Sequence, residues 1–148
     1  MKKTVLNKPV FFLLSFTWGI VMTLIGLAAA GIMLLLGYRP YRNIYGWAFE
    51  IPGTNFGGID LGFICIVSEN PGEYLLNHEF GHSVQNCFWG PLFPFVIAIP
   101  SMTRYWYREF RRRSGKGNKT GYYDIWFEGN ASDWGYAYFN HEKEKSMV

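Results

Sequence analysis

Two histidines and a glutamate near the middle of the chain have the types and spacing that metal-assisted hydrolysis requires. His78, Glu79 and His82 form the pattern H-E-x-x-H. Because residues four apart lie on the same face of a helix, both imidazoles can bind one metal ion. Glu79 can then reach a water molecule on that ion and act as its general base. The pattern therefore predicts a zinc site with His78 and His82 as ligands and Glu79 as the catalytic residue.

The residues before the motif predict the helix that it needs. Asn70 can cap a helix, Pro71 suits the first helical position, and Glu73 completes a capping box. We expect a helix from Pro71 to about Trp89, ended by the Gly-Pro pair that follows. The motif then lies in mid-helix, where the backbone is regular and both histidines share one face.

A zinc ion that performs catalysis needs a third protein ligand, and Glu128 is the best candidate in the sequence. A third histidine close behind the motif is excluded, because Phe88 occupies the position where it would stand. On a helix, Glu128 shares its face with three small residues: Ala131, Ser132 and Gly135. Gly81, within the motif, is also small, so two helices can approach here and bring Glu128 to the histidines.

Other acidic residues nearby are weaker candidates for the third ligand. Asp124 lies one helical turn before Glu128. It could replace Glu128 as the ligand or hydrogen-bond to a ligand. Asp133 points to another face of the expected helix, and His141 belongs to the polar tail. The sequence singles out no residue that would orient the two imidazoles.

Around this motif the chain resembles the gluzincin-like zincin metallopeptidases, and more closely small uncharacterised bacterial membrane proteins with an H-E-x-G-H motif. The likeness covers roughly residues 56–135. The matching segments are His78–His82, Gly90–Leu92, Tyr122–Asp124 and Glu128–Ala131. The resemblance implies zinc bound by His78, His82 and Glu128, with Glu79 catalytic, and implies no substrate. One departure is Ser132, where the relatives tend to have an aspartate.

These features together predict a membrane-anchored zinc metalloendopeptidase that hydrolyses peptide bonds. A zinc-activated water would attack the peptide carbonyl while Glu79 accepts its proton and delivers it to the leaving amine. Three tyrosines are equal candidates to donate to the oxyanion: Tyr122, Tyr123 and Tyr136. A substrate peptide can add as a strand to an edge of the sheet. The alternatives are a non-catalytic membrane protein with a structural metal site or a partner-binding zincin-like fold, and a membrane scaffold without metal.

An uncharged apolar run at residues 10–36 predicts a transmembrane helix, which with its N-terminal tail makes up residues 1–40. A signal peptide is rejected, because the run continues beyond the alanines where cleavage would occur. Four small residues lie on one face of this helix: Gly19, Thr23, Gly26 and Ala30. Such a face allows close helix packing, including formation of a homo-oligomer.

Residues 41–148 are expected to form a small zincin-like domain of class α+β. Turn-forming residues at 52–55 and 57–58 separate short β-prone runs, which predicts two or three short antiparallel strands. Residues 63–67 are the clearest of these strands. The H-E-x-x-H helix follows, and the last helix, from Tyr122 to about Phe139, carries the third ligand. From His141 onward the polar tail is expected to fray.

Residues 88–103 form a second apolar segment, interrupted by three prolines. It is expected to be re-entrant, interfacial or buried, because a full crossing would separate Glu128 from the histidines. Seven basic residues follow closely, with only Glu109 against them: Arg104, Arg108, Arg111, Arg112, Arg113, Lys116 and Lys119. We expect this cluster to contact anionic lipid head groups. Nucleic acid is not an expected partner, because no binding motif accompanies the charge.

The flanking charges leave the membrane orientation open. The three lysines before the apolar run (Lys2, Lys3 and Lys8) favour a domain outside the cell, whereas the arginine cluster favours one inside. We expect a bacterial inner-membrane protein with its domain at the cytoplasmic face. Cys65 and Cys87 lie in apolar runs, so both are expected to be buried, without a redox or metal role.

Overall fold

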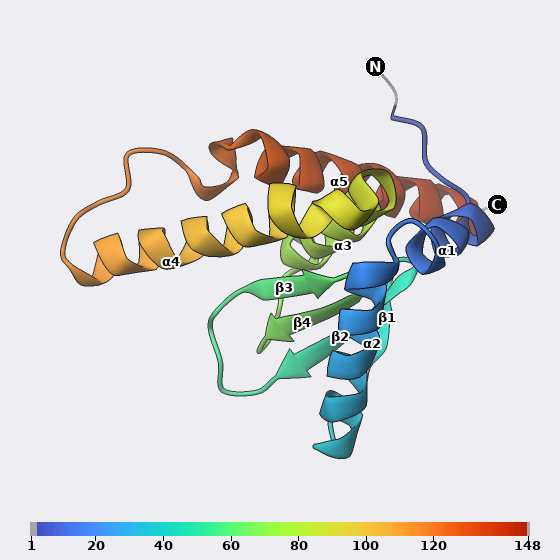
Figure 1. The fold of residues 1–148 in the computed structure, drawn as a ribbon, viewed down its shortest axis with the longest axis horizontal. Helices are drawn as coiled ribbons and strands as arrows, with labels where there is room; N and C mark the ends of the chain where they lie inside the picture. The colour runs from blue at the N-terminus through green and yellow to red at the C-terminus, as the bar shows by residue number, and fades with distance from the viewer. Residues whose placement is uncertain (1–2, 148) are drawn as a thin grey trace.

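In the computed structural model, which describes residues 3–147, the chain has an α+β fold, as the sequence predicts (Figure 1). Its five helices are α1 (Lys8–Phe16), α2 (Ile20–Leu35), α3 (Glu73–Trp89), α4 (Ile99–Arg113) and α5 (Trp126–Ser146). Three short helical turns are η1 (Gly90–Leu92), η2 (Pro94–Ala98) and η3 (Tyr122–Asp124). The strands are β1 (Tyr41–Asn43), β2 (Gly46–Ile51), β3 (Gly58–Leu61) and β4 (Ile64–Ser68).

The four strands form one mixed sheet in the order β1-β2-β4-β3. The expectation of an antiparallel sheet is therefore wrong for its central pair, because β2 and β4 run parallel. After β2 the chain crosses to the outer edge and forms β3. A tight hairpin through Gly62, whose φ of +80° favours glycine, then returns β4 into the gap beside β2.

The apolar run near the N-terminus forms two helices rather than the single helix expected, because α1 and α2 meet at an angle of 93°. The break is held by α3, since the Asn86 side-chain amide donates to the carbonyl oxygen of Gly19 (3.2 Å). Within residues 3–147, no single helix combines the length and apolar character needed to cross a membrane, although the bent α1–α2 pair has both together. Lys2, one of the three lysines that flank this run in the sequence, lies outside the described residues.

The small residues of α2 pack against the chain's own sheet. A side chain at Gly26 would overlap the carbonyl oxygen of Leu61, and Gly62 lies against the backbone of Thr23. On the other face of the sheet, Cys65 and Val67 pack against Leu75 and Leu76 of α3. The sheet is therefore held between α2 and α3.

Helix α3 begins later than expected, at Glu73, and Asn70 does not cap it. Gly72 stands at the N-cap, and no side chain hydrogen-bonds to the helix end. Asn70 instead adopts a left-handed conformation (φ 50°) in the turn after β4, where its N–H donates to Glu50 Oε1 (2.9 Å). The helix ends at Trp89, as predicted, with Gly90 at the C-cap.

The second apolar segment is helical, running through η1 and η2 into α4. Phe93 and Ile97 are buried against Met22 of α2 and Phe127 of α5. The basic cluster therefore begins on a helix, and three of its arginines donate to carbonyl oxygens of the returning loop at Gly117, Thr120 and Gly121.

The next helix, α5, starts at Trp126 rather than Tyr122 and includes the tail to Ser146, which was expected to fray.

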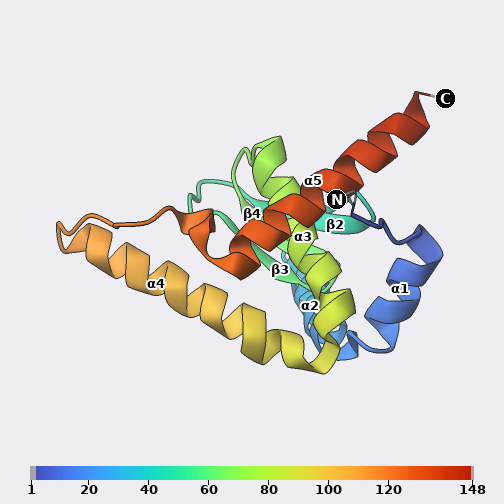
Figure 2. The ribbon, with the colours of Figure 1, turned by 90° about the horizontal axis from the view of Figure 1, so that it is seen from above.

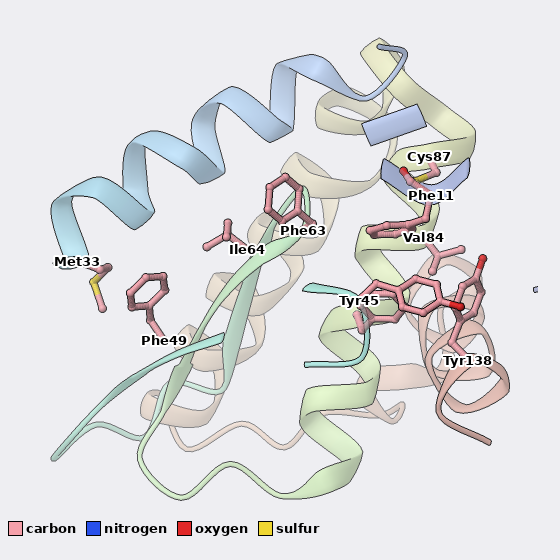
Figure 3. Close-up of a cluster of buried hydrophobic side chains, with 10 residues drawn as sticks. Phe11, Met33, Tyr45, Phe49, Phe63, Ile64, Val84, Cys87 and Tyr138 are labelled. Atoms are coloured by element: carbon pink, nitrogen blue, oxygen red, sulfur yellow. The ribbon is translucent and has the colours of Figure 1, made fainter. Parts of the chain in front are cut away.

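An aromatic cluster joins the N-terminal helix to the rest of the fold (Figure 3). The ring of Phe11 packs on Tyr45 and Phe80, and Tyr138 packs on the same two residues. The Tyr138 hydroxyl accepts a hydrogen bond from the N–H of Leu6 (2.9 Å). Both cysteines are buried and unbridged, as expected.

Helices α3 and α5 lie side by side, and their separation is set by two glycines (Figures 1 and 2). A side chain at Gly81 of α3 would overlap the carbonyl oxygen of Ala131, and one at Gly135 of α5 would overlap that of Asn77. The stripe of small residues inferred from the sequence thus faces the motif helix, as predicted.

Replacing Gly135 with alanine should force the two helices apart. We expect Gly135→Ala to lower the free energy of unfolding by about 1–3 kcal/mol, measured by chemical denaturation of the purified protein. Gly31→Ala is the matched control, because a side chain at that helical glycine meets no atom within 4 Å. Equal stability of the two variants would contradict the close packing.

Candidate metal centre

The packing of α3 on α5 brings His78, His82 and Glu128 into one buried group. Glu128 Oε2 lies 3.1 Å from His78 Nε2 and 3.3 Å from His82 Nε2. The ligand atoms of all three residues lie within 4.8 Å of one another. None of the three side chains is more than 8% exposed. The structure therefore brings together the three ligands that the sequence predicts.

Hydrogen bonds to the far nitrogens fix both imidazoles. His82 Nδ1 lies 2.8 Å from Gln85 Oε1. The Gln85 amide group donates to the carbonyl oxygen of Phe127 and to Asn130 Oδ1, so its oxygen must face the histidine. His82 Nδ1 therefore carries a proton, and Nε2, which faces Glu128, is the nitrogen that can bind a metal ion.

His78 is held in the same way from α5. Its Nδ1 lies 2.9 Å from Ser132 Oγ, and that hydroxyl donates to the carbonyl oxygen of Glu128 (3.3 Å). When Nδ1 of His78 donates to Ser132, its Nε2 is the nitrogen that can bind a metal ion. Partners of this kind keep metal-binding imidazoles in one tautomer and orientation.

The carboxylate oxygen that faces the two imidazoles lacks the hydrogen bond that a buried polar atom normally has. Glu128 Oε2 is buried without a hydrogen-bond partner, although two imidazole nitrogens face it. Either a proton or a metal cation between the carboxylate and the imidazole nitrogens would balance this buried negative charge. This buried group can hold a metal ion, and two imidazoles with one carboxylate are a donor set that suits zinc.

The surrounding charges also favour a cation at this point. Burial lowers the pKa of His82, but the carboxylates of Glu128, Glu79 and Asp60 raise it by more, to about 9. Burial raises the pKa of Glu128, but the two imidazoles and the Ser101 hydroxyl outweigh this and hold it well below its usual range. Glu128 therefore stays ionised, and the site stabilises positive charge between it and the imidazoles.

Glu79 is buried beside the group, between α3 and the edge strand β3. A Cβ atom at Gly58 would lie 2.6 Å from Glu79 Oε1, so only glycine leaves room for this carboxylate. Burial raises the pKa of Glu79, the two histidines lower it and Glu128 raises it, with a net upward shift. A carboxylate with a raised pKa is a better proton acceptor near neutral pH.

The three residues of the motif line a cavity of about 710 Å³. Its other walls come from α2, strands β3 and β4, and the segment from η2 to α4. The walls are mainly apolar, with Ile25, Ile59, Phe93 and Trp106 among them. The cavity therefore joins the polar group of the motif to an apolar space that a ligand can enter.

The other candidate site residues from the sequence differ in whether they lie near the cavity and the buried group. Tyr122 lines the cavity, and the ring of Tyr123 lies edge-on to His78, with centroids 4.9 Å apart. Tyr136 is 58% exposed and does not line the cavity. Asp124 accepts a hydrogen bond from the N–H of Gly121 (2.6 Å) in η3, and neither it nor Asp133 joins the group.

Two residues that position the imidazoles, Gln85 and Ser132, were missed in the sequence. Gln85 follows His82 by three positions and Ser132 follows Glu128 by four, so helical spacing was the signal that could have revealed them. Asp60 was missed as well. It lines the cavity from β3 and accepts a hydrogen bond from Ser83 Oγ (2.6 Å), while burial raises its pKa well above the usual range.

Comparison of the chain with models of known protein families, with curated proteins and with solved structures finds no match.

Removing the carboxylate should abolish tight metal binding. We expect Glu128→Ala to weaken zinc affinity more than about 100-fold, because two imidazoles alone remain. The measurement is competition with a chromophoric chelator, using protein purified in detergent. Asp133→Ala is the matched control on the same helix, since its side chain is 71% exposed. Unchanged affinity of Glu128→Ala would show that another residue supplies the third ligand.

Loss of either partner of the imidazoles should have a smaller effect. We expect Gln85→Ala and Ser132→Ala each to weaken zinc affinity about 10–100-fold, because a freed ring no longer presents one fixed nitrogen. The same competition assay measures this. If both variants bound zinc as the parent chain does, the two hydrogen bonds would have no role in the site.

Proposed function

We propose that the chain is a membrane-associated zinc metallopeptidase that hydrolyses peptide bonds. One observation supports the proposal: His78 and His82, which form a buried group with Glu128, line a cavity together with Glu79. Three protein donors leave a coordination position open, as catalytic zinc sites do, whereas structural zinc sites use four. The H-E-x-x-H pattern of His78, Glu79 and His82 in the sequence favours the same proposal.

Bound zinc supplies Lewis-acid chemistry, which polarises a carbonyl and makes water more acidic. Glu79 provides the proton transfers. Its carboxylate accepts a proton from the attacking water and then delivers it to the amine that leaves. The raised pKa of Glu79 suits both steps, because the group must first gain the proton and later release it.

Tyr122 is the residue that can donate to the developing oxyanion. It lines the cavity together with His78 and Glu79. Burial and the nearby Glu128 raise the pKa of Tyr122, so its hydroxyl keeps its proton and remains a donor. A fixed donor at this place would stabilise negative charge on the scissile carbonyl oxygen.

The edge strand β3 offers a place for an extended peptide. It pairs only with β4, so its outer backbone groups face away from the sheet. Gly58 of this strand adjoins Glu79, and Ile59 lines the cavity. A peptide added along β3 would therefore pass beside the proposed catalytic carboxylate.

The membrane part of the proposal concerns α1 and α2. Together they have the length and composition of a membrane segment, and they expose apolar side chains such as Leu13, Leu24 and Leu35. We propose that this pair anchors the chain to a bacterial inner membrane with the metal site at its cytoplasmic face. The competing proposal is a membrane protein whose metal has only a structural role.

The two proposals differ in what they require of Glu79. We expect Glu79→Gln to retain zinc and to lower the rate of peptide cleavage by about 10²–10⁴-fold, because the amide cannot accept the proton. Zinc content and cleavage of a peptide library by the same preparation measure the two effects.

Glu73→Gln on the same helix is the matched control, because it lies in the first turn, outside the cavity. Equal cleavage by Glu79→Gln and the parent chain would contradict the mechanism. Zinc binding by a parent chain that cleaves no peptide in the library would favour the structural site.

A further inference from the structure

Helix α4 and the turn before it expose a continuous apolar stripe. Its members recur three or four positions apart and are each more than half exposed: Phe95, Ile99, Met102, Trp106 and Phe110. Residues with this spacing lie on one face of a helix. Monomeric proteins rarely leave so many large apolar side chains in one exposed row. We therefore expect the stripe to be an interaction surface.

The opposite face of this segment fixes its position on the protein. Ile97 is fully buried, and Ser101 donates its hydroxyl to Glu128 Oε1. Further along, Arg104 and Arg108 donate to the carbonyl oxygens of Gly121 and Thr120. Because these contacts hold α4 by its inner face, the apolar stripe must point outward.

The stripe borders the same side of the molecule as α2. Figure 1 shows α2 in front of the sheet and α4 above it, with the two helices running in different directions. Ile25 of α2 and Met102 and Trp106 of α4 all line the metal-site cavity, and all three are partly exposed. The mouth of the cavity is therefore framed by exposed apolar side chains from two helices.

The order of side chains along α4 indicates what covers the stripe. The turn before α4 carries Phe95, and the helix begins with Ile99 and Met102. Its middle carries Trp106 and Tyr107, and its end carries Arg112 and Arg113, both about 70% exposed. Lys116 and Lys119 follow, both exposed. An exposed apolar row, accompanied by amphipathic aromatics and followed by cations, is typical of a helix that lies in the surface of an anionic bilayer.

We propose that α4 lies in the surface of an anionic bilayer, with its apolar stripe inserted and its basic end among the head groups. The metal-site cavity then opens at the membrane surface. This docking goes beyond the proposed peptidase function and does not depend on metal or on catalysis.

The test measures the membrane depth of single labelled positions. The full chain is reconstituted in nanodiscs with one environment-sensitive fluorophore at Ile99→Cys or Phe110→Cys. The two native cysteines are buried and remain unlabelled under mild conditions. Both labelled positions are exposed, at 52% and 69%, so the label does not disturb the core. Asp133→Cys on α5 is the control.

Quenchers attached to the lipid acyl chains should reduce the emission of both α4 labels and place them about 5–10 Å below the head-group boundary. The control label should stay accessible to a water-soluble quencher. Neutral lipid in place of anionic lipid, or a chain with Arg112, Arg113, Lys116 and Lys119 all changed to glutamine, should move both α4 labels toward water.

Two results would overturn the proposal. One is α4 labels that remain as accessible to the water-soluble quencher as the control. The other is protection that depends on protein concentration and not on lipid composition, since this would show that a second copy of the chain covers the stripe.

Discussion

The close approach of α3 and α5 is the constraint on which the rest of the structure depends. Two glycines, Gly81 and Gly135, let each backbone rest against a carbonyl group of the other helix. Only at this separation does Glu128 reach both histidines of α3. The same contact lets Ser132 reach His78 and lets Gln85 reach the start of α5. The packing of α3 on α5 therefore determines whether the three proposed metal ligands come together.

Electrostatics explains why these helices hold such polar groups inside. A buried carboxylate facing two imidazoles is costly unless a proton on an imidazole or a metal cation balances it. A bound metal would contribute to stability as well as to chemistry, because its binding energy is available only to the folded chain. The apolar cavity walls then strengthen every charge interaction at Glu79. The cavity also links this polar centre to the exposed helices α2 and α4.

Much of the site could be predicted from the sequence, because helical spacing alone places His78 and His82 together and identifies small residues around Glu128. The fold was less accessible. The bend between α1 and α2 depends on a hydrogen bond from distant Asn86, and no local pattern reveals it. The parallel pairing of β2 with β4 arises because the chain forms the edge strand β3 first and then places β4 beside β2. Strand propensities do not predict this order. Asp60 was missed because its strand, β3, is too short for alternation of apolar and polar residues to show which side chains face the cavity.

X-ray absorption at the zinc edge reports the ligands of the metal itself, so it shows whether His78, His82 and Glu128 bind zinc. We expect one zinc ion per chain with two imidazole nitrogens at about 2.0–2.1 Å and carboxylate oxygen at about 2.0–2.2 Å. No sulfur should be present, since Cys65 packs with Ala48 and Val67, and Cys87 contacts Ser15. A sulfur ligand at about 2.3 Å, or a chain that binds no zinc, would contradict the account.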